Sequence, residues 1–157
     1  MKNKQLFDKT LDILVDAYMN DKLIHSDCAA CAVGNIIQAN GIQLVSEQDD
    51  ETPTKQVYYQ KTAAWLRLIN EEIRDSPQGG RYDRKLALEQ IAVTGYTCEE
   101  LNRIEKAFEC HNGAVSGDQK MFNSLMQVVD ALIEIHEGED DEREISKSLF
   151  VKVESAI

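Results

Sequence analysis

The sequence has few of the features that place a protein in a membrane or among nucleic-acid-binding proteins. No apolar run approaches the ~18 residues that a membrane-spanning helix needs, so we expect no association with a membrane. Basic residues are scarce: 17 Lys and Arg stand against 28 Asp and Glu, which gives a formal net charge of -11. This charge repels phosphate backbones, whereas nucleic-acid-binding domains present basic surfaces. We therefore expect no direct binding of DNA or RNA.

The start of the chain lacks the uninterrupted apolar core of a secretory signal, because charged residues are spread through it: Lys2, Lys4, Asp8, Lys9, Asp12 and Asp16. A cytoplasmic location is therefore expected. The chain has only four cysteines, and in a reducing compartment these are thiols or metal ligands rather than a disulfide framework.

With 157 residues the chain has the length of one domain. We expect a helical domain over residues 1–136, with residues 137–157 as an acidic segment and C-terminal appendage of the same domain. Much of the negative charge gathers near this boundary: Glu134, Glu137, Glu139, Asp140, Asp141, Glu142 and Glu144. Beyond it, Ile145, Leu149 and Val153 have helical spacing, although residues 148–153 fit a strand equally well.

Apolar residues recur at three- and four-residue spacing along most of the chain, which predicts an all-α fold: a compact bundle of about five to seven helices. The first helix places Leu14, Val15 and Tyr18 on its apolar face and should end near Leu23. A second helix is expected over residues 28–40, with Ser26 or Asp27 as its N-cap. Residues 42–54 are expected to form a loop, with a short strand or β-hairpin as the alternative.

Four further helices are predicted. One covers residues 57–73, in which Trp65 is either a core anchor or, with Tyr58 and Tyr59, part of a ligand-stacking wall. Helix N-caps are expected at Asp83, at Thr97, which can form a capping box with Glu100, and at Asp118. The last helix carries Phe122 on an apolar face that we expect to point into the core, and a partly exposed His136 near its end.

The second predicted helix contains Gly34, which costs about 1 kcal/mol relative to alanine inside a helix. A glycine at such a position is explained if a neighbouring backbone or side chain presses against it. We therefore interpret the small residues of this segment as packing residues.

The main candidate for chemistry is the array His25, Cys28 and Cys31, because imidazole and thiolate groups at this spacing can bind zinc. A fourth ligand would have to come from Cys98, Cys110 or His111. Zinc in such a site would stabilise the fold rather than act in catalysis. The spacing is not that of a complete zinc site, which usually shows two recognisable ligand pairs.

Two other interpretations of the cysteines stay open. Cys28 and Cys31 can be small apolar residues of a tightly packed helix, since free cysteine is among the most buried residue types. Alternatively, Cys28 in the first turn of a helix would gain thiolate character from the helix dipole, as a thiol-disulfide oxidoreductase requires.

Residues 28–37 (CAACAVGNII) and 95–109 (GYTCEELNRIEKAFE) resemble segments of a family of small uncharacterised bacterial and phage-associated proteins. In that family a C-x-x-C-A-V-G-N core is followed by a G-Y-T/S-x-E-E-L-x-x-I-E-x-A-F helix and a terminal amphipathic helix, an order that this chain reproduces. The resemblance implies a helical domain. It carries no activity and no catalytic residue over to this chain.

The sequence contains no phosphate-binding glycine motif, nucleophile elbow or dinucleotide fingerprint. The absence of a complete catalytic constellation, together with the acidity, favours a non-enzymatic interaction or regulatory domain with a protein partner of basic character. One variant of this hypothesis is that the acidic surface imitates nucleic acid and occupies a basic site on another protein.

Overall fold

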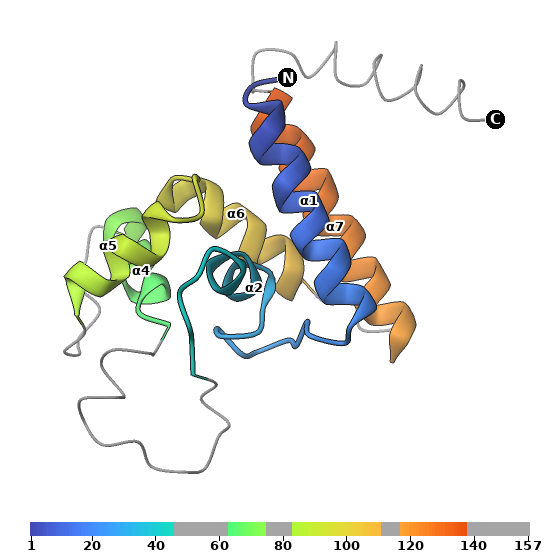
Figure 1. Cartoon of the computed structure of the whole chain (residues 1–157), viewed down its shortest axis with the longest axis horizontal. Helices are drawn as coiled ribbons and strands as arrows, with labels where there is room; N and C mark the ends of the chain where they lie inside the picture. Colours follow the sequence, from blue (N-terminus) through green and yellow to red (C-terminus); the bar gives the residue numbers. More distant parts are fainter. Residues whose placement is uncertain (46–62, 75–82, 111–116, 138–157) are drawn as a thin grey trace.

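The computed structural model describes residues 1–45, 63–74, 83–110 and 117–137, and all regular secondary structure in these ranges is α-helical (Figure 1). The helices are α1 (Lys4–Met19), α2 (Ala32–Ala39), α4 (Trp65–Arg74), α5 (Arg84–Ala92), α6 (Cys98–Glu109) and α7 (Asp118–Glu137). The prediction of an all-α bundle is therefore confirmed. Residues 42–45 form no strand, and the rest of the alternative hairpin and the predicted C-terminal element lie outside the described residues.

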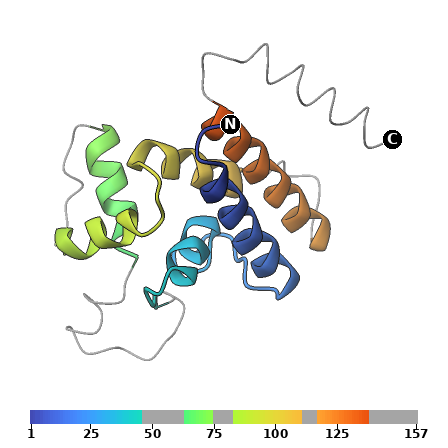
Figure 2. The same cartoon turned by 45° about the horizontal axis from the view of Figure 1, so that its top comes forward.

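The two longest helices, α1 and α7, lie side by side and run in opposite directions (Figures 1 and 2). Helix α6 is central to the fold, because it packs against α2, α4 and α7. Helices α4 and α5 form a second pair at the end of α6 that lies away from α1. Among the described helices, none is long and apolar enough to cross a membrane.

The hydrophobic core lies where α6 meets the other helices. Trp65, at the start of α4, is completely buried, which confirms its prediction as a core anchor. The largest other apolar side chains with almost no exposed surface are Phe108, Leu14, Ile36, Ile37, Leu68, Ile69, Leu101, Ile104 and Leu132. Burial of each such side chain contributes roughly 1.5–3 kcal/mol to the driving force for folding.

Local capping chemistry explains several of the helix boundaries. Asp83 accepts a hydrogen bond from the amide of Leu86 at 3.1 Å, as predicted. Thr97 and Glu100 form the predicted capping box, with reciprocal bonds of 3.2 and 2.9 Å. Helix α7 begins at Asp118 itself, so the prediction of Asp118 as its N-cap was wrong: the residue lies in the first turn, and the carbonyl oxygen of Gly117 accepts hydrogen bonds from the amides of Lys120 and Met121. The caps at Asp83 and Thr97 satisfy amide groups that would otherwise lack a partner at the first turn of each helix.

Three helix ends differ from the prediction. Helix α1 ends at Met19 rather than near Leu23, because Asn20 caps it and Asp21 takes the left-handed backbone conformation, with φ of 56°. Helix α2 begins at Ala32 rather than at residue 28. Helix α4 begins at Trp65, so Ala64 precedes it, and the earlier part of the predicted helix lies outside the described residues.

Candidate functional site

Residues 27–31, which we call the cysteine turn, form a tight turn before α2 and not its first turn. The carbonyl oxygen of Asp27 accepts hydrogen bonds from the amides of Ala30 and Cys31, and its carboxylate accepts one from Ala29 at 3.0 Å. Cys31 has extended backbone geometry and is the N-cap of α2. Its sulfur accepts a bond from the amide of Gly34 at 3.4 Å. The expected cap at Asp27 therefore stabilises a turn, and Cys31 caps the helix.

Gly34 allows the cysteine turn to lie directly against α2. A Cβ atom at this position would come within 2.5 Å of the main chain of Ala29 and 2.6 Å of the Cys28 carbonyl oxygen. Carbon atoms do not approach so closely, so no larger residue fits without moving the turn. This contact confirms the prediction that a neighbouring backbone presses against Gly34.

The side chain of Asn35 holds the turn and the segment before it in place. Its amide nitrogen donates to the carbonyl oxygens of Lys22, Ala30 and Cys31 at 2.9 to 3.1 Å. Gln38, one turn further along α2, donates to the carbonyl of Ala29 at 2.6 Å. Buried carbonyl groups are costly without a donor, so this part of the C-x-x-C-A-V-G-N segment has a structural role.

His25, the histidine of the predicted zinc array, packs against α6 and α7. Its Nε2 atom lies 2.8 Å from the hydroxyl oxygen of Ser124, and its ring stacks on Phe108 with 4.6 Å between the ring centroids. Both contacts fix the orientation of the ring. Neither was visible in the sequence, because the partners lie more than 80 residues further along the chain.

The predicted zinc ligands are only partly brought together. Cys98 is the first residue of α6 and Cys110 follows the last one, so they stand roughly 18 Å apart along the helix and cannot share a metal ion. The carboxylate of Glu109 accepts bonds from the amide of Ser26, so the cysteine turn lies near the Cys110 end. His111 lies outside the described residues. Within those residues, no three His, Cys, Asp or Glu side chains form a group suited to a metal.

Burial controls the protonation of two of the thiols, Cys31 and Cys98. Cys31 is almost completely buried, and this burial raises the pKa of its thiol far above the ordinary value. Burial also raises the pKa of the Cys98 thiol to about 12, helped by a hydrogen bond to Glu72 and its negative charge. Both groups therefore stay protonated at neutral pH, whereas a reactive cysteine needs a lowered pKa. Cys28 is half-buried and Cys110 is exposed.

A carboxyl group beside the cysteine turn is also perturbed. Burial, together with the negative charge of Glu109 on the next turn, raises the pKa of Glu105, on α6, to about 7. The same two carboxylates disfavour a negative charge on Cys31. The environment of the turn therefore opposes thiolate formation from more than one side.

His136 is buried, with 3% of its surface exposed, so the prediction of a partly exposed histidine was wrong. Its Nε2 atom lies 2.8 Å from the hydroxyl oxygen of Tyr96, and its Nδ1 atom lies 2.6 Å from the carbonyl oxygen of Lys2. Tyr96 also donates to Thr10, on α1, at 2.9 Å. These contacts tie the end of α7 to the start of the chain, which sequence periodicity could not reveal.

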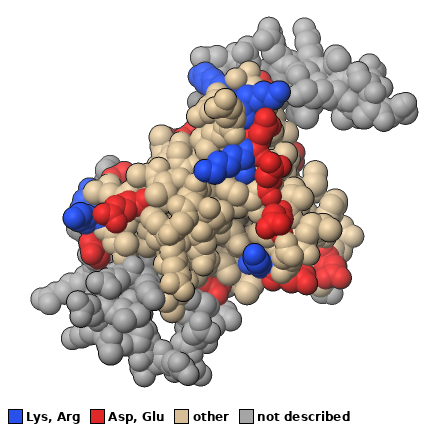
Figure 3. Space-filling model, in the orientation of Figure 1, with Lys and Arg blue, Asp and Glu red and all other residues tan. Residues whose placement is uncertain are grey.

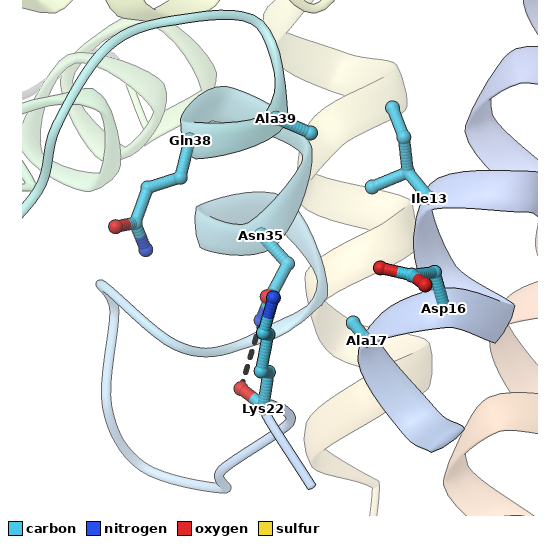
Figure 4. A pocket seen from close by; sticks show the side chains of 7 residues that line it. All are labelled: Ile13, Asp16, Ala17, Lys22, Asn35, Gln38 and Ala39. Atoms are coloured by element: carbon cyan, nitrogen blue, oxygen red, sulfur yellow. Dashed lines mark hydrogen bonds between the residues drawn. The ribbon is translucent and has the colours of Figure 1, made fainter. Parts of the chain in front are cut away.

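Two open cavities adjoin α1. The larger, of about 470 Å³, has Ile13 and Asp16 of α1 on one side, Asn35 and Gln38 of α2 on the other, and Lys22 below (Figure 4). Asn35 and Gln38 already use their amide groups to hold the cysteine turn. This cavity is therefore bordered by the same side chains that stabilise the fold.

The smaller cavity, of about 420 Å³, lies where α1 ends and α7 begins. Tyr18, Met19, Leu23 and Met121 supply its apolar lining, and Asp21 and Asp118 supply carboxylates. It continues into an apolar surface on the two helices, which we call the α1–α7 seam and define as Val15, Tyr18, Met19, Phe122 and Met126; Tyr18 is half-buried and the other four are exposed. The rings of Tyr18 and Phe122 meet edge to face across the seam, at 6.2 Å between centroids.

The exposure of this seam was not predicted. Phe122 was expected on a core-directed face and Val15 on the apolar face of the first helix, yet they are 44% and 42% exposed. Only part of each apolar stripe is buried in the core. The buried residues include Leu14 on α1 and Leu125 and Leu132 on α7. The available signal was the width of the stripe on each helix, which exceeds what a single packing partner covers.

Acidic residues follow the seam on its α1 side. Asp8, Asp12 and Asp16 recur at four-residue spacing and are exposed. Figure 3 shows acidic side chains in a row along α1. None of the ion pairs that the described residues make involves a carboxylate of α1. We call these three residues the acidic row.

Comparisons with protein-family models, with curated proteins and with solved structures yield no match to this chain.

Proposed function

We propose that this protein is a non-enzymatic interaction domain that binds a positively charged protein partner in the cytoplasm. The observation that carries the proposal is the acidic row, an exposed series of carboxylates on one face of α1. Such a series raises the local concentration of cationic partners and accelerates their association, because opposite charges attract over about 10 Å at moderate salt. The free cysteines fit the reducing cytoplasm.

Two other candidate functions have less support. A thiol oxidoreductase requires an accessible cysteine with a lowered pKa, but Cys31 is buried and its pKa is raised. A zinc-stabilised domain requires ligands around Cys28 and Cys31 that the described residues do not supply. His25 instead contacts Ser124 and Phe108.

The proposal is tested by affinity capture from cell lysate with matched charge variants. The test variant Asp8→Asn/Asp12→Asn and the control variant Glu89→Gln/Glu99→Gln change the net charge by the same amount, but the control residues lie on α5 and α6. We expect the wild type and the control to recover proteins of high isoelectric point in a salt-sensitive manner. We expect the test variant to recover much less of them.

Recovery that shows no preference for basic proteins would contradict the proposal. Equal losses with both variants would show that only the total charge matters, and that the acidic row is no specific surface. Circular dichroism of the three proteins should be the same, because all four substituted side chains are exposed.

A further inference from the structure

Of the eight large apolar side chains that are exposed among the described residues, four lie on the neighbouring helices α1 and α7. Val15 and Met19 lie one helical turn apart on α1, and Phe122 and Met126 lie one turn apart on α7. Between 42% and 71% of the surface of each side chain is exposed. Two neighbouring antiparallel helices that each expose an apolar pair present an apolar surface on which a third helix can pack.

The cavity at the lower end of the seam adds an anchor point. Tyr18 and Met19 belong both to the seam and to the lining of this 420 Å³ cavity, so the two features are continuous. The cavity wall combines apolar side chains with the polar groups of Asp21 and Asp118. This combination fits a long side chain with an apolar stem and a cationic end, such as lysine or arginine.

Methionine is concentrated at the same place. Of the four methionines in the chain, Met19, Met121 and Met126 lie on the seam or in the cavity. The unbranched, polarisable methionine side chain adapts its shape to an incoming surface and is frequent where proteins bind helical partners.

We infer that the α1–α7 seam is the docking site for an amphipathic helix of a partner protein whose apolar stripe is flanked by lysine or arginine. The inference rests on the proposed function and specifies its partner. The acidic row borders the seam on α1, and Asp130 is exposed on α7, so a basic flank finds carboxylates on both helices. A second copy of this chain would bring the acidic rows of two subunits toward each other, which opposes self-association.

The test uses a fluorescein-labelled peptide of about 18 residues, long enough to cover α1, with leucine at helical spacing and lysine on the flanks. A scrambled peptide of the same composition is the peptide control. Fluorescence anisotropy measures the Kd of each peptide for wild type, Met19→Gln/Met126→Gln and Leu88→Gln. Leu88 is 48% exposed on α5 and lies outside the seam, which makes it the matched protein control.

We expect the amphipathic peptide to bind wild type and Leu88→Gln with the same Kd, and the double variant about tenfold more weakly. The scrambled peptide should bind about tenfold more weakly than the amphipathic one. Equal binding of both peptides, with no effect of the double variant, would overturn the docking site. Charge-dependent binding that the Asp8→Asn/Asp12→Asn variant reduces would in that case still support the proposed function.

If neither peptide bound to the protein in a salt-dependent manner, both the docking site and the proposed function would be contradicted. Analytical sedimentation of the wild type without peptide tests the remaining possibility, which is that the seam is the contact surface of a dimer. A dimer that Met19→Gln/Met126→Gln dissociates would overturn the inference, because the seam would then be occupied by a second copy of the chain.

Discussion

The cysteine turn and the α1–α7 seam differ both in residue type and in burial. In each of them the burial is the reverse of what the residue types suggest. The turn contains two thiols and follows His25, a combination that suggests chemistry, yet its residues are buried or half-buried, hydrogen bonded and pressed against α2. The seam contains valine, tyrosine, phenylalanine and methionine, which resemble core residues in the sequence, yet most of them are exposed. The chemically suggestive residues are therefore packed into the fold, whereas ordinary apolar residues form an exposed surface, which we propose as the docking site.

The largest effect on stability is expected at Gly34. Gly34→Ala places a methyl group within 2.5 Å of the main chain of Ala29, so the cysteine turn must move. We expect the free energy of unfolding to fall by about 3 kcal/mol, measured by chemical denaturation. Gly117→Ala is the matched control. Its added methyl group meets no atom within 4 Å, and its positive φ should cost only about 1 kcal/mol.

Asn35→Ala removes the donor that three carbonyl groups share. The carbonyls of Lys22, Ala30 and Cys31 lose their side-chain partner, and we expect a loss of about 2 kcal/mol in the same assay. Asn123→Ala, on the exposed face of α7, should change stability by less than about 0.5 kcal/mol. If both variants behaved alike, the side chain of Asn35 would not be what holds the turn.

Glu105 makes the environment of the turn sensitive to pH. Its pKa in the folded protein is about 7 against an ordinary value of 4.5, so the folded state binds this proton more tightly than the unfolded state. The contribution of Glu105 to stability is therefore greatest below pH 4.5 and is lost as the pH rises through 7. Glu105→Gln should be about 1 kcal/mol more stable than wild type at pH 8 and similar to it near pH 4.5.

Thermal or denaturant unfolding at both pH values checks this prediction, with Glu89→Gln, an exposed residue of α5, as the control. A Glu105→Gln variant that is less stable than wild type at pH 8 would show that the ionised carboxylate makes a favourable contact instead.

The smallest effect on stability is expected in the seam. Met19→Gln/Met126→Gln replaces exposed side chains with polar ones of similar length and good helix propensity, so unfolding should change by less than about 0.5 kcal/mol. A loss of several kcal/mol would mean that the seam belongs to the core, and the contrast with the cysteine turn would disappear.

Local rules predicted the parts of the fold that depend on neighbours in sequence. The capping box at Thr97, the cap at Asp83 and the close approach to Gly34 followed from residue types and spacing. The start of α2 could not be placed this way, because small residues and a possible cap at Asp27 suit a turn as well as a helix. These residues form a turn and not a helix because Cys31 caps α2 and the side chain of Asn35 donates to the carbonyls of the turn.

The candidate sites depend on contacts between distant parts of the chain, which periodicity does not contain. His25 meets Ser124 and His136 meets Tyr96 only after α7 has packed on the rest of the bundle. In the same way, the apolar stripes of α1 and α7 indicated helices that bury a face, but not how much of each face the core would use. The exposed remainder, Val15 and Phe122 among it, became visible only in the folded arrangement.

The most direct test of the contrast between turn and seam is a nuclear magnetic resonance titration of the ¹⁵N-labelled protein with the amphipathic basic peptide. We predict that the amide signals which shift belong to the second half of α1 and the first half of α7, including Met19 and Phe122, while those of α4 and α5 stay in place. If the shifted signals belonged to the cysteine turn and those of the seam did not change, the account would be contradicted, because it gives the turn a structural role and the seam the binding role.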